Sequence, residues 1–453
     1  MFETLKNAFK VKEIRKKLFI TLLLLLVYRV GCYIPVPGID SAQFSSVVTE
    51  NNFLYLMNSV TGGALASGTL FALGIGPYIN ASIIMQLLCV GIPALERLSK
   101  QGEEGKKKIA QITRFLTLAL AIIQSVGVII NFSSDSAISG QIVALFGGEN
   151  NRWLVYIYMT IIYSAGAMLT MWLGERITEY GVGNGISMII FVGIISTAGL
   201  TLITNPIQGA ITGTDPSTGE AFNGGSTLLA VILFCIIAVI VFALIVTVDL
   251  AERRIPVQYA KQVKGRKMYG GQSTVIPIKI SGSGVMPLIF AFAIISLPDL
   301  IMGLFAADSG AYASYQEWFS GGTGPLGWLY ILVLCLLIFL FSFFYAQIQF
   351  NPEDISKSIQ QNGGFIPGIR PGKPTADYLK KISNRITLFG AIFLSLVAFI
   401  PSLAFSFAGD QFVNVFSTTG ILIVVSVALE FDKQLQSQLM MNCLLYTSDA
   451  ADD

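Results

Sequence analysis

The sequence offers few side chains that could carry out catalysis or bind a metal ion. Histidine is absent, which excludes histidine metal ligands and a histidine general base. No GxxxxGK[ST] phosphate loop, HExxH motif, serine nucleophile elbow or dinucleotide fingerprint occurs. The chain has five cysteines, Cys32, Cys89, Cys235, Cys335 and Cys443, and they form no CxxC pair. Four of the five lie in or beside apolar runs, as small buried hydrophobes do. An enzyme is therefore not favoured, and no cofactor or metal is expected.

Polar and glycine residues interrupt the apolar stretch Gly62–Ala94. Its first dozen residues are small and glycine-rich, and its later part carries Asn80, Ser82 and Gln86. Hydrocarbon offers no hydrogen-bond partners, so such groups at membrane depth must face protein or a water-filled cavity. The stretch therefore predicts a segment that lines, and closes, a path through the membrane. Ordinary packing of small residues between helices is the alternative.

Composition places the whole chain in a membrane. Of its 453 residues, 53% are hydrophobic and only 12% are charged, about half the charged share of a soluble domain. Runs long enough to span a bilayer recur ten times, and an even number puts both termini on one side. The predicted spans are Leu18–Ile34, Gly74–Leu95, Ile109–Ile130, Trp153–Leu173, Asn184–Ile203, Thr227–Val248, Gly284–Phe305, Pro325–Gln347, Arg385–Phe405 and Phe412–Leu429.

Charge alternates between the connections of these spans. Every Lys and Arg lies on one side, except Arg152 in an opposite loop and Arg29 within the first span. The positive-inside rule makes that side, and both termini, cytoplasmic. Carriers coupled to ions usually keep several acids or bases inside the membrane, whereas Arg29 is the clearest such charge here. A secondary carrier for a small solute is therefore the less favoured alternative, and energy for transport is expected from a partner.

The spans suggest two halves, as in transport proteins built from inverted repeats. A cytoplasmic arm, residues 1–17, precedes a first five-span half at 18–225, and a second half follows at 226–435 with a tail at 436–453. Two long cytoplasmic connections, 249–283 and 348–384, mix charge, glycine and proline and are predicted to be protruding hairpins. Their basic residues either set topology alone or form a docking surface for a large charged partner, such as ribosomal RNA or a cytosolic ATPase.

Four motifs resemble one family in the same order and at the same loop positions. They are YRVGCYIPVPGID at 28–40, GGALASGTLFALGIGPYINASIIMQLL at 62–88, RRIPVQYAKQVKGRKMYGGQST at 253–274 and NGGFIPGIRPGKPTADYL at 362–379. Together they resemble the SecY family, the central channel subunits of the bacterial Sec translocase, from the N-terminal arm to about Met441. The resemblance implies an all-α polytopic membrane protein with ten transmembrane helices in two pseudo-symmetric halves, a clamshell around a central pore.

The resemblance also implies a pore ring and a plug. The ring consists of aliphatic side chains that dewet the empty pore and bind no passing chain strongly: Ile79, Ile83, Ile186, Ile190, Ile289 and Ile423. Taken singly, each isoleucine is more typical of an ordinary core, and only the family match favours a ring. The plug is implied to be a short helix whose small residues give it little packing and so let it leave: Gly62, Gly63, Ala64, Leu65, Ala66, Ser67, Gly68, Thr69, Leu70, Phe71, Ala72 and Leu73.

Further positions match the family's lateral gate and docking loops. Gln86 and Gln124 would be polar residues near a gate that the second span forms with the seventh and eighth; interhelical hydrogen bonding is the alternative. Arg266 and Lys267 match the tip of the first long loop, and Arg370 lies between two prolines in the second. A plain solvated charge is the less favoured alternative for each of these three cations.

The function implied is a protein-conducting channel of the bacterial cytoplasmic membrane. It would pass unfolded secretory polypeptides outward and release transmembrane segments sideways into the lipid bilayer. The resemblance implies SecE and SecG as heterotrimer partners, the SecA ATPase or the ribosome as energy source, a preprotein with its signal sequence as cargo, and SecDF and YidC as accessory partners. Residues 442–453, NCLLYTSDAADD, depart from the family's basic tail and are interpreted as foreign or artefactual sequence.

Overall fold

The computed structural model describes two compact units. Its described residues are 2–37, 39, 58, 61–133, 152–197, 239–240, 242–259, 262–264, 267–269, 273–280, 286–295, 298, 302, 310, 314–315, 327–408 and 418–452. The first unit comprises Met1–Leu228, Ala293–Tyr330 and Ala408–Asp453, and the second comprises Leu229–Phe292 and Ile331–Phe407. Each unit is described by itself below.

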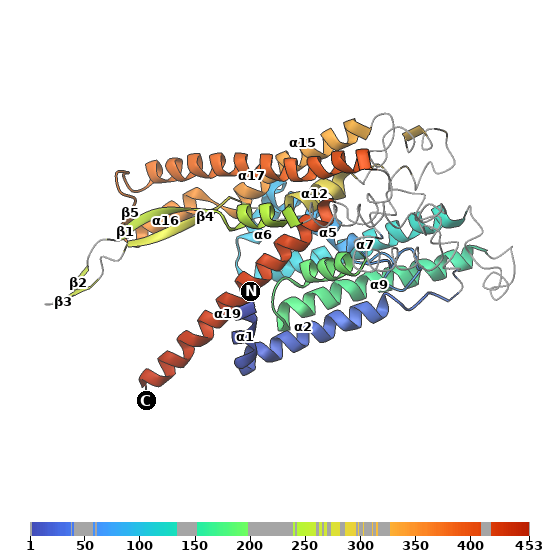
Figure 1. The fold of residues 1–453 in the computed structure, drawn as a ribbon, viewed down its shortest axis with the longest axis horizontal. Helices are drawn as coiled ribbons and strands as arrows, with labels where there is room; N and C mark the ends of the chain where they lie inside the picture. The colour runs from blue at the N-terminus through green and yellow to red at the C-terminus, as the bar shows by residue number, and fades with distance from the viewer. Residues whose placement is uncertain are drawn as a thin grey trace. The chain divides into compact units, whose positions relative to one another are not determined.

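Helices build the first unit (Figure 1). α5 packs on α7, and α9 packs on both α7 and α2, so that apolar stripes on these helices share one core. Near the N-terminus of α2, α1 packs on α19 through an apolar cluster that contains Ala8, Ile14, Val182 and Leu435. The helices are α1 (Phe2–Lys10), α2 (Lys12–Gly31), α5 (Gly76–Gly91), α6 (Pro93–Ser99), α7 (Glu103–Ser133), α9 (Arg152–Tyr180), the helix Gly185–Thr197 and α19 (Thr418–Asp452), which runs through most of the tail.

The predicted second span, Gly74–Leu95, is wrong at its end. α5 ends at Gly91, and the chain turns by 106° into α6. Ile92, which precedes a proline, takes an extended conformation with φ −108° and ψ 114°. Pro93 has no N–H to donate, so it can begin α6 at its first turn but cannot continue α5.

Within the described part of the chain, three helices are long and apolar enough to cross a membrane: Glu103–Ile129, Trp153–Tyr180 and Leu329–Gln361. The bent pair α5 and α6 would make a fourth if it counts as one broken span. These helices contain or overlap the predicted spans 109–130, 153–173, 325–347 and 74–95. Two further predicted spans, 18–34 and 385–405, lie largely in α2 and in α17 (Lys373–Ala408). The remaining four include residues outside the described ranges.

The second unit combines helices with a small antiparallel sheet. β1 (Glu252–Tyr259) pairs with β4 (Ser273–Lys279) in the register Glu252 with Lys279, and with β5 (Gly364–Phe365) at its other edge. A second hairpin, β2 (Gln262–Lys264) with β3 (Lys267–Tyr269), lies between β1 and β4 in sequence. The predicted hairpin at 249–283 is therefore confirmed. The helices are α12 (Met286–Ile295), α15 (Gly327–Gln349), α16 (Pro352–Gln361) and α17.

The hairpin predicted at 348–384 is wrong, because this connection folds into α16, β5 and a turn. Asn351 caps α16: its side chain accepts a hydrogen bond from Glu353 N at 3.2 Å, and Pro352 occupies the first helical turn. Alternate residues of β1, Ile255 and Val257, then pack on α16 and α17 in one apolar cluster. Burial of each such side chain contributes about 1.5–3 kcal/mol.

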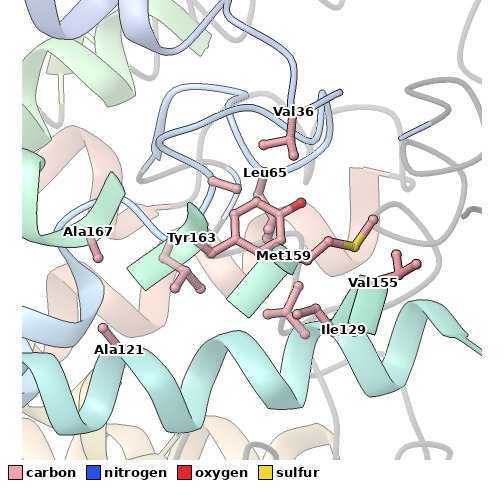
Figure 2. Close-up of a cluster of buried hydrophobic side chains, with 11 residues drawn as sticks. Val36, Leu65, Ala121, Ile129, Val155, Met159, Tyr163 and Ala167 are labelled. Carbon is pink, nitrogen blue, oxygen red and sulfur yellow. The ribbon is translucent and has the colours of Figure 1, made fainter. Parts of the chain in front are cut away.

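The core of the first unit lies between α7, α9 and a glycine-rich segment at 61–75. Figure 2 shows Leu65 and Tyr163 side by side, with Met159 close to both. α9 approaches the segment so closely at Gly166 that a Cβ there would lie 1.9 Å from the carbonyl oxygen of Leu70. The cluster joins Val36, Leu65, Ala72 and Leu73 with Ala121, Val128 and Ile129 of α7 and with Val155, Met159, Tyr163 and Ala167 of α9.

We predict that Gly166→Ala destabilises the protein by about 1–3 kcal/mol, the usual cost of overpacking a filled core. A lowered midpoint of thermal unfolding in detergent would measure this loss. Gly91→Ala is the matched control, because a Cβ at Gly91 meets nothing within 4 Å. Equal midpoints for the two variants would contradict the close contact between α9 and Leu70.

Candidate functional site

The predicted plug, 62–73, is a chain of turns and not the expected short helix. Four glycines in or beside it have positive φ: Gly62 at 74°, Gly63 at 87°, Gly68 at 57° and Gly74 at 52°. Residues with a Cβ rarely adopt this region, whereas glycine does so at no steric cost. The same glycines that suggested a small-residue helix therefore break the helix.

The segment is also tightly packed, so the expectation that small residues leave it loosely held is wrong. Ala64, Leu65, Ala72 and Leu73 are at most 1% exposed. The ring of Phe71 stacks on Tyr28 of α2, with centroids 5.7 Å apart and planes inclined by 12°. Small residues here permit close approach of the backbone, which increases the number of dispersion contacts.

Backbone hydrogen bonds join this segment to the chain that leaves α2. Val36 N donates to Gly68 O, and Leu70 N donates to Ile34 O, both at 3.0 Å. Thr69 pairs with Pro35 as an isolated β-bridge. Non-helical backbone at membrane depth must find its partners within the protein, and these bonds supply several of them.

Arg29 contacts the beginning of the segment. It lies in the last turn of α2, and its Nη1 donates to Gly62 O at 3.0 Å. Its Nη2 donates to the hydroxyl of Tyr33 at 3.3 Å and to Ser196 Oγ on the helix Gly185–Thr197. The sequence marked Arg29 as a charge within a span but gave no sign of these partners.

Five of the six predicted ring residues belong to the first unit. Ile79 and Ile83 lie one helical turn apart on α5, Ile186 and Ile190 lie on the helix Gly185–Thr197, and Ile423 lies on α19. Ile289 belongs to α12 in the second unit. Since the ring includes residues of both units, it stays a prediction.

The two gate glutamines have different surroundings. Gln86 Nε2 donates to Ser82 Oγ at 3.4 Å, one turn earlier on α5. Gln124 on α7 is 2% exposed, and within the described residues its Oε1 has no hydrogen-bond partner. Leaving a buried amide oxygen unpaired costs about 1–3 kcal/mol. The bond of Gln86 thus lies within α5, and the gate role of both glutamines stays a prediction.

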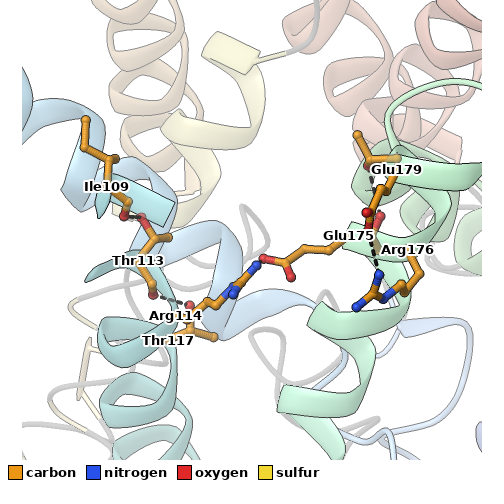
Figure 3. Close-up of polar contacts among 9 residues, drawn as sticks. Ile109, Thr113, Arg114, Thr117, Glu175, Arg176 and Glu179 are labelled. Carbon is orange, nitrogen blue, oxygen red and sulfur yellow. Dashed lines mark hydrogen bonds and ion pairs between the residues drawn. The ribbon is translucent and has the colours of Figure 1, made fainter. Parts of the chain in front are cut away.

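An ion pair joins the N-terminal half of α7 to the C-terminal part of α9. Figure 3 shows Arg114 reaching toward Glu175, with Nε and Oε1 2.9 Å apart. On α9 itself, Arg176 pairs with Glu179 at 2.6 Å. Nothing local in the sequence indicates that Arg114 has a partner 61 residues away. Half-exposed pairs of this kind contribute about 0–1 kcal/mol.

The predicted docking residues lie in the second unit. Arg370 is exposed in the turn between β5 and α17, where Gly368 and Gly372 have φ of 82° and 96°. Thr375 Oγ1 donates to Arg370 O at 2.8 Å, and Ser356 Oγ of α16 donates to Gly372 O at 2.7 Å. The turn therefore holds its backbone in place. Lys267 lies on β3, and Arg266 lies outside the described residues.

A cavity of about 560 Å³ adjoins this turn, between the end of α15, α16 and the start of α17. Its walls carry both signs of charge, including Glu353, Lys357, Lys373 and Asp377. In the described part of the chain, no group of three or more His, Cys, Asp or Glu residues could hold a metal ion.

Comparison with known proteins decides the family. The family model for SecY matches residues 69–431. The chain belongs to the SecY family. Protein translocase subunit SecY of Streptomyces galbus is 42% identical over 448 residues, which cover 97% of this chain and 98% of the relative. The family inferred from the four motifs is therefore confirmed.

Solved structures give the SecY-family fold. A structure of the SecY protein whose plug domain stabilises the closed channel has a TM-score of 0.65 at 22% identity, with 93% of this chain and 92% of the other covered. Canine Sec61 in a ribosome–channel complex has a TM-score of 0.59 at 20% identity, with the same coverage. The polytopic membrane fold is thereby confirmed as mostly helical, with a small sheet in the second unit, and the predicted ten-helix clamshell is consistent with it.

We predict that Leu65→Ala loosens the segment at 61–75, because a fully buried leucine leaves a cavity that costs about 2–5 kcal/mol. Amide hydrogen exchange within the segment should then accelerate by at least about tenfold. Ser67→Ala, at an exposed position of the same segment, should leave exchange unchanged. Equal exchange in both variants would show that the packing of Leu65 does not hold the segment.

Proposed function

We propose that the chain is the channel subunit of a bacterial Sec translocase and conducts unfolded secretory polypeptides across the cytoplasmic membrane. The observation that carries this proposal is its 42% identity, over nearly its whole length, to a protein translocase subunit. Structures of similar fold are protein-conducting channels. The protein is a channel subunit and not an enzyme, and the secondary-carrier alternative has no support among these relatives.

The segment 62–73 is proposed to be the plug of this channel. Leu65, Leu73 and the stack of Phe71 on Tyr28 pack it against α2, α7 and α9, and this would be its position in the closed channel. Opening then requires these contacts to break together. The glycine turns support movement as a unit, since their backbone can change conformation without a Cβ to obstruct it.

The isoleucine ring is proposed to seal the pore around a moving chain. Ile79 and Ile83 share one face of α5, and a ring of such side chains excludes water without binding the cargo. Two halves, 18–225 and 226–435, would open as a clamshell so that transmembrane segments leave sideways past Gln86 and Gln124.

Partners are proposed from the docking loops and the charge pattern. Exposed Arg370 and the β2–β3 hairpin carrying Lys267 support docking of the SecA ATPase or the ribosome, and canine Sec61 of similar fold is seen in a ribosome–channel complex. SecE and SecG would complete a heterotrimer, with a signal-bearing preprotein as cargo and SecDF and YidC as accessory factors. The basic loops support cytoplasmic termini.

We predict that a stalled secretory chain crosslinks to cysteines placed at Ile79, Ile83 and Ile289, because a ring that seals around cargo must touch it. Crosslinking in an actively translocating complex measures this contact. A cysteine at Ile123, a partly exposed position on α7, is the control and should not react. Absence of crosslinks at all three ring positions would contradict the proposal that these isoleucines surround the translocating chain.

We predict that deletion of residues 62–73 makes reconstituted channels leaky to ions, because the seat between α2, α7 and α9 is left unfilled. Ion flux from vesicles measures the leak, and Ser67→Ala, with the segment intact, should match the unmodified chain. A deletion that leaves vesicles tight would favour a scaffold without a plugged pore.

A further inference from the structure

Arg29 is an unusual residue for its position. It belongs to the predicted first span, where charge is costly unless paired. The structure places it in the last turn of α2, where the carbonyl end of the helix dipole favours a cation. Its guanidinium is half-buried and extends away from α2 toward two other elements.

The guanidinium bridges three parts of the first unit. Nη1 donates to Gly62 O, the first carbonyl of the plug, at 3.0 Å. Nη2 donates to Ser196 Oγ, and so reaches the helix that carries ring residues Ile186 and Ile190. Nη2 also contacts the hydroxyl of Tyr33 at 3.3 Å. Two nitrogens of one planar guanidinium thereby donate hydrogen bonds to two different elements. The compact ammonium of a lysine is less suited to holding both contacts at once.

Gly62 is shaped to receive this contact. A Cβ there would lie 2.4 Å from Arg29 Nη1 and 3.0 Å from the Cα of Gly193, which belongs to the same helix as Ser196. Its φ of 74° also excludes most other residues. The first peptide of the plug is thus enclosed between the arginine and the helix Gly185–Thr197.

We propose that Arg29 is the anchor of the plug: a positioning residue that holds Gly62 against α2 and the helix Gly185–Thr197, and so sets how readily the plug leaves. This inference rests on the proposed plug role of 62–73. It also gives the release a trigger. When an entering chain displaces the helix Gly185–Thr197, Ser196 moves with it, and the anchor loses one of its contacts.

The test uses the full chain in its heterotrimer, reconstituted in vesicles, with two measurements: resting ion flux and amide exchange at 61–75. Arg29→Met should raise both by about tenfold or more, because loss of even one of the three hydrogen bonds donated by this charged group has an effect of about that size. Arg29→Lys should raise them less, because one contact can persist, and Ser196→Ala should also raise them. The control is Arg176→Met, which removes another helix-end arginine whose recorded partners, Glu179, Trp172 and Tyr180, all lie on α9.

Combination with the deletion of 62–73 separates an anchor from a general structural role. An anchor acts only through the plug, so Arg29→Met should add no further ion flux in the deleted chain. Added flux there would overturn the proposal, as would unchanged flux and exchange in Arg29→Met when the deletion itself leaks. If Arg29→Met does not fold, unchanged exchange in both Arg29→Lys and Ser196→Ala would overturn it instead.

The outcomes also distinguish this inference from the function on which it rests. A deletion that leaves vesicles tight refutes the plug, whereas amide exchange still reports whether Arg29 holds Gly62. Faster exchange in Arg29→Met, together with a leaky deletion that Arg29→Met does not worsen, supports both.

Discussion

The first unit depends on one constraint: the segment at 61–75 must satisfy its backbone hydrogen bonds without forming a helix. The segment at 61–75 cannot use helical bonds throughout, because its glycines take positive φ. Its peptide groups instead bond to one another in turns, to Ile34 and Val36 after α2, and to the guanidinium of Arg29. Where water is scarce, each unpaired group would cost several kcal/mol, so the seat and the segment have to fit each other.

Close packing follows from the same glycines. Gly31 allows the ring of Phe71 to lie over α2, and Gly166 allows α9 to approach the carbonyl of Leu70. Any Cβ at these positions would push the segment out of its seat. Association in a membrane relies on such van der Waals contact more than on the hydrophobic effect, since lipid is as apolar as leucine. The small residues thus let the segment pack closely against α2 and α9. They also leave few large side chains that would have to lose their contacts if the segment moved.

Hydropathy and length are enough to locate α7, α9 and α15, because a bilayer demands long apolar runs. They do not locate the bend at Pro93 or the turns at 62–73, where single glycines and prolines override the apolar pattern. The Asn351–Pro352 cap was a local signal that could have revealed α16. No local signal pairs Arg114 with Glu175 or Arg29 with Gly62, which are 61 and 33 residues apart. Family motifs located the segment 62–73 that is proposed to be the plug, but the short helix that they implied there is wrong.

A polar anchor suits the proposed plug, a segment that would have to close firmly and yet be released abruptly. Dispersion between Leu65 and its neighbours is the sum of many weak contacts and declines gradually as the segment shifts. A hydrogen bond from Arg29 to Gly62 depends steeply on distance and angle, so a small displacement removes most of it. Because the same guanidinium also bonds to Ser196, movement of one helix weakens the hold on another element. Packing therefore sets how well the segment fits, whereas the arginine sets when it is released.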